Sequence, residues 1–308
     1  MVAVAVPPAR TGASGWTAAA AVAPASIVVT IGIVLPIVIL FRYSLNQYTP
    51  AKMMVDAFTI ENYAKFLTDP FYLAVLFRTI RVAALCTAVC VVLAFPMAYC
   101  LARTRSRFKN LLLMAVILPL FVGNAVRAAG WMVLFGNRGF VNSILMGLGI
   151  IREPLQIMYT EFAVVVGVIA VNLPFVVLTL QAVLEGIDRA IEEAALGLGA
   201  GPWRTFRHII LPLAMPGVIA GTILSFILAM NAYATPVLLG GPTFQMMGPT
   251  VYNQFAGLSN WPFGAAMSFV LMTATLLLTV TSNWLAQARY RRAMPASINV
   301  TVKRDVAA

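Results

Sequence analysis

Residues 212–238 read PLAMPGVIAGTILSFILAMNAYATPVL, and no position in this stretch carries a charged side chain. The stretch lies within a longer run, 208–288, that contains no Asp, Glu, Lys or Arg. A helix needs about 20 mainly apolar residues to cross the hydrocarbon core of a bilayer. The run is too long for one such helix, and the turn-forming residues between Gly240 and Pro262 divide it. We therefore expect two membrane-spanning helices here, at 212–238 and 263–286.

The rest of the chain shows the same pattern. Of its 308 residues, 61% are hydrophobic and 10% are charged, whereas about a quarter of the residues in a soluble domain are charged. Uncharged stretches predict further spans at 17–41, 73–102, 110–135 and 161–184, the third of which is interrupted by Arg127. We expect an all-α polytopic membrane protein with about six transmembrane helices. Three parts are expected: an N-terminal segment at 1–72 with the first helix and an outer loop, a core at 73–288 with the other helices, and a basic tail at 289–308.

Lysine and arginine are distributed unevenly between the two sides of the membrane. With the N-terminus inside, the inner segments hold thirteen of these residues and the outer segments hold five. Cytoplasmic loops carry such an excess, so both termini are predicted to be cytoplasmic. The net charge of +11 then reflects topology and attraction to anionic lipid headgroups, and it does not indicate nucleic-acid binding. The first apolar stretch continues beyond the about 7–15 residues of a signal peptide, so we expect it to remain as a helix.

No arrangement of side chains in the sequence indicates catalysis or a metal site. Cys86, Cys90 and Cys100 all fall in the second predicted helix, and no His or further Cys completes a tetrahedral metal site. His208 is the single histidine and has no nucleophile or carboxylate at a suitable spacing. The chain also lacks the Gly-rich loop that binds nucleotide phosphates. We predict that the chain is not an enzyme and that it holds no cofactor of its own.

The segment between the fourth and fifth predicted helices, 185–213, has an amphipathic pattern. Apolar residues recur at helical spacing on one face, and charged residues lie on the other: Ile187, Ile191, Ala194, Ala195 and Leu198 against Asp188, Arg189 and Glu192. Gly199 predicts the end of this helix, because glycine accepts the left-handed conformation. Pro202 predicts the start of a second short helix, which is expected to end before Pro212. Two short amphipathic helices joined at a glycine turn would form a projecting element, which we call the knob (residues 185–213). Such an element either fits a groove on a partner or lies on lipid headgroups, and the periodicity leaves both possibilities open.

The spacing within this segment resembles the signature of binding-protein-dependent ABC importer permeases. The matching positions are Glu193, Ala194, Ala195, Gly199, Ile209, Leu211 and Pro212. The resemblance covers about residues 75–288 and implies the type I ABC importer permease fold in a bacterial inner membrane. It also implies that 185–213 is the coupling loop, which sits in a cleft of a separate ATPase subunit, and that the complex has two such ATPase subunits, which bind ATP and Mg. A second, related permease subunit and a periplasmic or extracytoplasmic solute-binding protein are the other implied partners.

Further motifs are similar to those of the spermidine/putrescine-type permeases, a group that also includes permeases for opines, phosphonates and iron carriers. They include Leu118-Pro-Leu-Phe with Val126-Arg127, Gly139-Phe-Val-Asn142, Asn172-Leu-Pro174, Pro236-Val-Leu-Leu-Gly-Gly241 and Trp261-Pro-Phe-Gly. The resemblance implies import of a small organic solute that is polyamine-like, amino-acid-like, or opine- or phosphonate-like. The alternative function is a secondary transporter or channel. Coupling to ions would need carboxylates inside the membrane, and the interiors of the predicted helices contain none.

A few polar residues in the apolar spans are candidates for the solute pathway: Asn124, Arg127, Asn172, Asn231 and Tyr233. Asparagines also join membrane helices through hydrogen bonds, and Arg127 is equally suited to support a helix bend. Arg78 and Arg81 fit snorkelling to the outer interface. Polyamine-type permeases usually carry an acidic residue in the fifth helix, whereas residues 230–239 contain none here. The expected solute is therefore zwitterionic or anionic rather than a polyamine.

Overall fold

The computed structural model describes residues 15–293, which form helices, turns and loops with one isolated β-bridge between Gln47 and Val55. The long helices are α1 (Gly15–Ser44), α3 (Pro70–Arg103), α7 (Glu161–Glu185), α10 (Leu211–Met230) and α12 (Trp261–Ala293). The shorter ones are α2 (Glu61–Thr68), α4 (Lys109–Ile117), η1 (Leu118–Phe121), α5 (Asn124–Phe135), α6 (Phe140–Gly147), α8 (Arg189–Gly197), α9 (Pro202–Thr205), η2 (Phe206–Ile210), η3 (Pro236–Gly240), α11 (Met247–Tyr252) and η4 (Asn253–Gly257). Residues 1–14 and 294–308, which include most of the predicted tail, lie outside the described residues.

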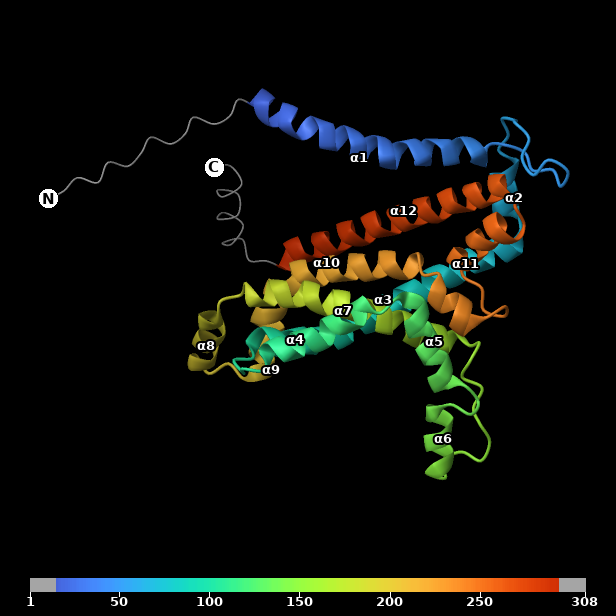
Figure 1. The fold of residues 1–308 in the computed structure, drawn as a ribbon. Coiled ribbons are helices and arrows are strands. Elements are labelled where there is room, and N and C mark those ends of the chain that lie inside the picture. The colour runs from blue at the N-terminus through green and yellow to red at the C-terminus, as the bar shows by residue number, and fades with distance from the viewer. Residues whose placement is uncertain (1–14, 294–308) are drawn as a thin grey trace.

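The long helices run along a common direction, with α8 at one end of the bundle and α2 at the other (Figure 1). Within the described part of the chain, five helical stretches are long and apolar enough to cross a membrane, or six if one bent pair counts as a span. This confirms the predicted all-α fold with about six transmembrane helices. The described start of α1 and the end of α12 point toward the α8 end (Figure 1).

The third predicted span is sharply bent. Residues 109–121 and 124–147 are bent against each other by 97°. The break follows a 3₁₀ turn that contains Pro119, after which Val122 is extended with φ −88° and ψ 124°. A proline has no amide hydrogen to donate to the preceding turn, and Gly123 then starts α5 at its N-cap. These residues are uncharged, so the composition of the stretch concealed the break.

The fifth span also differs from its predicted bounds. The helix that starts at Pro202 continues to Met230 without a break, so the second short helix does not end before Pro212. Residues 206–210 form a π-helical turn, in which the Leu211 amide binds the Phe206 carbonyl. This wider turn lets the helix pass through Pro212, which cannot donate a backbone hydrogen bond. At the other end, the Asn231 side chain donates to the Ile227 carbonyl at 2.9 Å. It thereby competes for this carbonyl with the main-chain amides that would continue the helix.

Helices α3, α7 and α10 pack together at the centre of the molecule, and α12 packs on α10. Glycines bring α7 and α10 close to each other. A Cβ atom added at Gly217 would lie 2.9 Å from the Cβ of Val183, and one at Gly221 would lie 3.1 Å from Val176 Cγ1. Small residues allow this close approach of membrane helices. Two buried clusters result, one toward the α2 end around Met230 and one toward the α8 end around Leu184.

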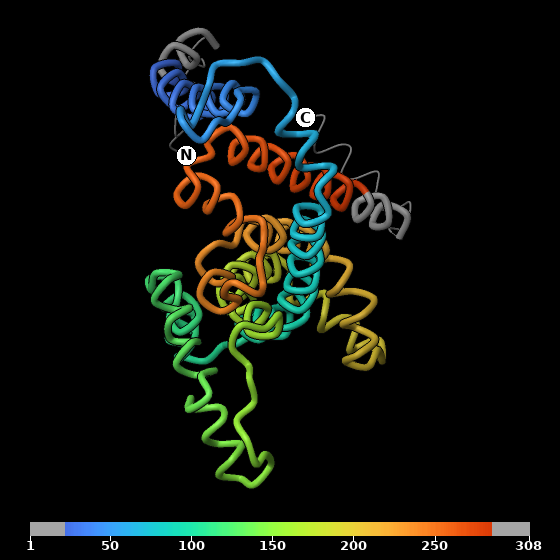
Figure 2. Tube along the Cα trace, turned by 90° about the vertical axis from the view of Figure 1, so that its right-hand side faces the viewer, coloured from blue at the N-terminus to red at the C-terminus, as the bar shows by residue number. Residues whose placement is uncertain are grey.

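Two elements extend from this centre on opposite sides. Helix α1 packs against α12, where Phe41 and Phe269 meet edge to face with ring centroids 5.2 Å apart. No residue of its apolar window is buried, as expected for a helix whose surface faces lipid. Helices α5 and α6 form an arm that projects away from the bundle in both views (Figures 1 and 2).

Candidate functional site

Helix α8 is defined at both ends by local hydrogen bonds. The Asp188 side chain accepts a hydrogen bond from the Ala190 amide at 2.9 Å and so caps the N-terminus. At the C-terminus, Gly199 adopts φ +82°. Its amide binds the Leu196 carbonyl, and the Ala200 amide binds the Ala195 carbonyl, both at 3.0 Å. These paired bonds form a Schellman motif, and they confirm the predicted role of Gly199 as the residue that ends the helix.

The predicted apolar face of α8 divides between the protein and its surface. Ala195 is buried, and Ile187 packs against the cluster around Leu184. Ile191 and Leu198 are exposed instead, with Leu198 at 89%. The apolar residues Ile187 and Ala195 therefore pack the knob against the bundle. Ile191 and Leu198 form a second apolar surface that packs against no other part of the described chain.

The helix that follows the glycine turn attaches the knob to the bundle. Phe206 meets Phe95 of α3 edge to face at 5.3 Å, and Trp203 stacks on Phe206 at 5.4 Å. Ile210 is buried in the same cluster, whereas Trp203 is 70% exposed. The predicted coupling residues Ile209, Leu211 and Pro212 are half-buried at the start of the long helix.

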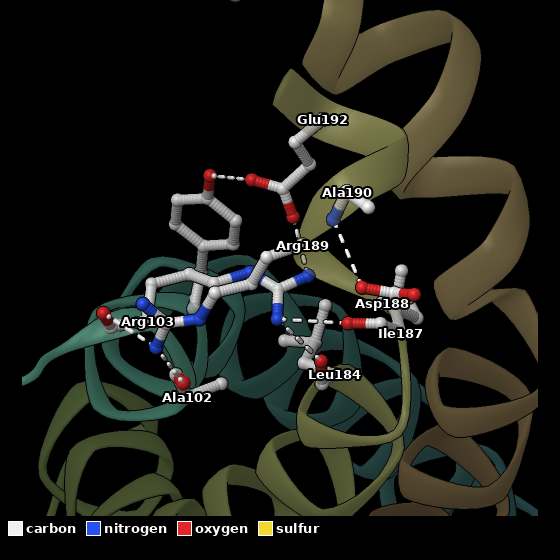
Figure 3. A network of polar contacts seen from close by, with 9 residues as sticks. Ala102, Arg103, Leu184, Ile187, Asp188, Arg189, Ala190 and Glu192 are labelled. Carbon is white, nitrogen blue, oxygen red and sulfur yellow. Dashed lines mark hydrogen bonds and ion pairs between the residues drawn. The ribbon is translucent and has the colours of Figure 1, made fainter. Parts of the chain in front are cut away.

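A second set of contacts, which is polar, holds α8 against the ends of α3 and α7 (Figure 3). Arg103, the last residue of α3, forms an ion pair with Glu192 of α8, and the two side chains are only 13% and 15% exposed. Tyr99 of α3 donates its hydroxyl hydrogen to the same carboxylate at 3.0 Å. Glu192 is thus bound by two side chains from one neighbouring helix.

The two arginines of this network also bind main-chain carbonyl groups at helix ends. Arg103 donates to the carbonyls of Leu184 and Ile187 at 3.0 and 3.1 Å, just where α7 ends. Arg189 of α8 donates to the carbonyls of Ala102 and Arg103 at 3.2 and 2.8 Å, where α3 ends. The last carbonyls of a helix have no partner within the helix, and cations are favourable there.

These contacts distinguish two adjacent glutamates of α8. Glu193, which matches the family signature, is exposed, and no hydrogen bond or ion pair is found for it among residues 15–293. Its neighbour Glu192 makes the polar contacts with the bundle. Ala194 is also exposed, so that within the Glu-Ala-Ala triplet only Ala195 is buried. Consecutive residues on a helix point about 100° apart, and a short motif does not show which of two adjacent glutamates faces the protein.

Toward the α2 half, all five predicted pathway residues line one cavity of about 560 Å³. Asn124 and Arg127 come from α5, Asn172 from α7, and Asn231 and Tyr233 from the turn after α10. A second cavity of about 580 Å³ shares Asn231 and Tyr233 and continues along α12. No carboxylate lines either cavity in the described chain.

The residues of this cavity differ in how fully they are bonded. The Asn172 amide donates to the Ser225 carbonyl at 3.1 Å and is buried, so it joins α7 to α10. Arg127 donates to the Asn124 side chain through Nη2. Its Nε and Nη1 atoms are buried and have no hydrogen-bond partner within the described residues. The guanidinium therefore retains donors beside the cavity.

The other two membrane arginines bind protein groups rather than only snorkelling to the interface. Arg81 forms an ion pair with Glu161 at the start of α7. Arg78 donates to the Gln245 carbonyl at 3.3 Å and lies over the Phe244 ring, 5.2 Å from its centroid. Within the described part of the chain, no group of His, Cys, Asp or Glu side chains is arranged to hold a metal ion.

Comparison with known proteins agrees with this architecture. The family described as binding-protein-dependent transport system inner membrane component matches residues 71–294. The spermidine/putrescine transport system permease protein PotB of Escherichia coli (strain K12) is 36% identical over 237 residues, which cover 77% of this chain and 86% of that protein. The probable sulfate transport system permease protein cysT of Prototheca wickerhamii is 31% identical, with coverage of 73% and 86%.

Solved structures share the fold. A chain in the crystal structure of a bacterial alginate ABC transporter, in complex with alginate pentasaccharide-bound periplasmic protein, superposes with a TM-score of 0.75 at 16% identity, covering 89% of this chain and 95% of that chain. A chain of the MetNI methionine ABC transporter gives a TM-score of 0.51 at 17% identity, with coverage of 74% and 100%. The chain therefore belongs to the family of binding-protein-dependent transport system inner membrane components, as an ABC importer permease subunit of the spermidine/putrescine-type group.

Proposed function

We propose that this permease passes a small organic solute from a solute-binding protein through the cavity at Asn231 into the cytoplasm. Two ATPase subunits, which bind ATP and Mg, drive the transport, and one of them docks on the α8 knob. A second, related permease subunit completes the passage. The observation that carries the proposal is the pair of features on one chain: a cavity with polar residues in its wall toward one end of the bundle and a firmly held knob with exposed apolar residues at the other.

The knob has the surface expected of a docking element. Ile191, Leu198 and Trp203 are large apolar residues that remain exposed, and apolar residues grouped on a surface mark interaction sites. The knob lies at the end of the bundle to which the excess of lysine and arginine assigns the cytoplasm. An apolar surface at that position suits an ATPase subunit that has no membrane span of its own.

The cavity favours a solute with an anionic group. Arg127 lines the cavity with a guanidinium whose Nε and Nη1 atoms are buried and unbonded, and Gly123 and Asn124 at the start of α5 line it too. A helix N-terminus carries a partial positive charge. The end of α10 at Met230, which carries the opposite partial charge, lies beside Asn231 at the same cavity. A small zwitterion or anion fits this arrangement better than a polyamine, for which no carboxylate is present in the described lining.

The relatives named above leave the solute open, because one is named for spermidine and putrescine and another for sulfate. Family membership alone is therefore compatible with cationic and anionic solutes. The proposal of a zwitterionic or anionic solute rests on the cavity and on its arginine.

Reconstituted vesicles test both the importer assignment and the class of solute. The chain is inserted with its partner permease, ATPases and solute-binding protein, and uptake is measured with labelled spermidine, a neutral amino acid and an aminoalkylphosphonate. We expect ATP-dependent import of one of the last two, reduced by Arg127→Gln and not by Arg138→Gln, which changes an exposed arginine outside the cavity. Saturable spermidine import would refute the solute class alone. Uptake driven by an ion gradient without ATPases would refute the importer and support a secondary transporter.

A further inference from the structure

We propose that Tyr99, Arg103, Arg189 and Glu192 form a clamp that makes α8 move as one body with the ends of α3 and α7. In this view Arg103 and Glu192 are positioning residues for energy coupling, since they hold the knob on which the ATPase acts. The inference rests on the proposed function, in which the ATPase docks on α8. It adds the path by which a movement of the knob reaches the solute cavity.

The clamp is reciprocal, and this makes it resist movement in more than one direction. Arg103 extends from α3 to the last carbonyls of α7 and to Glu192 of α8. Arg189 extends back from α8 to the last carbonyls of α3. Sliding α8 away from α3 would break the Arg103–Glu192 ion pair and the Arg189 hydrogen bonds at once, because each arginine binds a group on the helix that carries the other (Figure 3).

Burial distinguishes this ion pair from its neighbours. The Arg103 and Glu192 side chains are 13% and 15% exposed, against 30% and 38% for the Lys109–Glu185 pair at the same end of the bundle. An exposed pair contributes little, because water and salt screen it. Removing one partner of a buried pair leaves an uncompensated charge and is strongly unfavourable. The Arg103–Glu192 pair is therefore screened less by water than the Lys109–Glu185 pair.

The covalent connection from α8 toward α10 is looser by comparison. It passes through Gly197, Gly199 and Gly201, and a Cβ atom at any of these positions would meet no other atom within 4 Å. Glycine linkages without packing around them bend easily. A displacement of α8 is thus transmitted first through the clamp to α3 and α7.

Helix α7 then links the clamp to the cavity. Leu184, whose carbonyl receives the Arg103 hydrogen bond, is buried near one end of α7. Asn172 of the same helix lines the cavity and binds the main chain of α10. Helix α7 is continuous from Asn172 to Leu184, with Pro174 inside it, so a tilt of the helix at Leu184 reaches Asn172. The clamp therefore connects the ATPase-docking end to the solute cavity through one helix.

The test uses a reporter of cavity opening that does not depend on knowing the solute. Cys86, Cys90 and Cys100 are replaced by alanine, and Ala234→Cys is introduced in the cavity wall. The complex with its partner permease and ATPases is then treated with a membrane-impermeant maleimide, either without nucleotide or with ATP trapped by vanadate. In this parent we expect nucleotide trapping to change the labelling rate about tenfold, as a shift between two states of the passage requires.

Glu192→Gln should abolish that change while the ATPases remain bound and hydrolyse ATP. The matched control is Lys109→Gln, which removes an ion pair at the same end without touching α8, and it should respond like the parent. Hydrogen exchange in the α8 amides should be about tenfold faster in Glu192→Gln than in the control. If Glu192→Gln does not insert, Tyr99→Phe takes its place, since it removes one bond to Glu192 and leaves the ion pair; a reduced response is then expected.

A parent-like nucleotide response in Glu192→Gln, or in Tyr99→Phe where that variant is used, would overturn the clamp and leave the proposed function standing. A parent that neither retains the ATPases nor responds to nucleotide would overturn the proposed function, and the clamp's role in coupling with it.

Discussion

Replacing Gly199 with valine should strongly reduce uptake without preventing insertion of the chain. Gly199 has φ +82°, a conformation that costs an L-residue about 1–2 kcal/mol and is a genuine outlier for a β-branched residue. The new side chain would meet no steric obstacle, because nothing lies within 4 Å of a Cβ atom at this position. The whole penalty is therefore one of backbone conformation.

The size of the effect follows from what the turn holds together. A knob in which valine leaves the left-handed region avoids that backbone cost but loses the two Schellman hydrogen bonds from Gly199 and Ala200, each worth about 0.5–1.5 kcal/mol net. The two costs are alternatives, so the docking-competent knob becomes less favourable by the backbone cost alone, about 1–2 kcal/mol. A factor of ten in an equilibrium corresponds to about 1.4 kcal/mol. Docking of the ATPase should accordingly weaken by roughly 5- to 30-fold.

The assay compares ATPase retention by the purified permease with ATP-dependent uptake, alongside membrane insertion. Gly197→Val is the matched control, since Gly197 is the last residue of α8, also has open space around it and does not have a positive φ. Gly199→Asn should fall between wild type and valine, because asparagine tolerates the left-handed region better than other residues with side chains. Normal uptake and ATPase retention by Gly199→Val would refute the argument that this turn shapes the docking surface.

Three further predictions concern topology, packing and partnership. A cysteine at Asn299 should resist a membrane-impermeant thiol reagent in intact cells, because the excess of lysine and arginine predicts that this end lies in the cytoplasm; labelling without lysis would contradict this topology. Gly217→Leu should destabilise the chain by about 1–3 kcal/mol through overpacking against Val183, and this should lower its melting temperature in detergent. Gly32→Leu in α1 should not lower it, because nothing lies within 4 Å of a Cβ atom there. Purification of the active complex should recover a second, different permease chain; an active homodimer would contradict that prediction.

Sequence reasoning succeeded where a single residue or a local run determines the outcome. Uncharged runs predicted the spans because a bilayer core excludes charge over a fixed thickness, and Gly199 was identified because few residues adopt its conformation. The bend after Pro119 was missed, since proline is common in membrane helices and often leaves them continuous. Asn231, in contrast, was identified as a cavity residue because a polar side chain in an apolar run is rare.

The Arg103–Glu192 pair could not be predicted in the same way, because its members lie in segments far apart in the sequence. A single sequence shows that each segment is charged but not which charges meet. The sequence does contain one indication of this pairing. Arg103 ends a long uncharged run, and the next charged segment predicted on the same side of the membrane has three charged residues on its polar face: Asp188, Arg189 and Glu192.

The arginines at the two ends of the bundle have different bonding. Those at the α8 end hold helices together, whereas Arg127 lies at the cavity with few partners. At the α8 end, Arg103 and Arg189 donate to carbonyls within the protein, and Arg103 also pairs with Glu192, so that of the Arg103 nitrogens only Nε lacks a partner in the described chain. At the cavity, Arg127 has only Asn124 as a partner and keeps Nε and Nη1 free of protein acceptors in the described chain. Leaving buried donors unpaired is costly unless a ligand or water satisfies them. A permease that opens the cavity to a solute would relieve this cost at the moment of binding, and a solute with an anionic group would relieve it most.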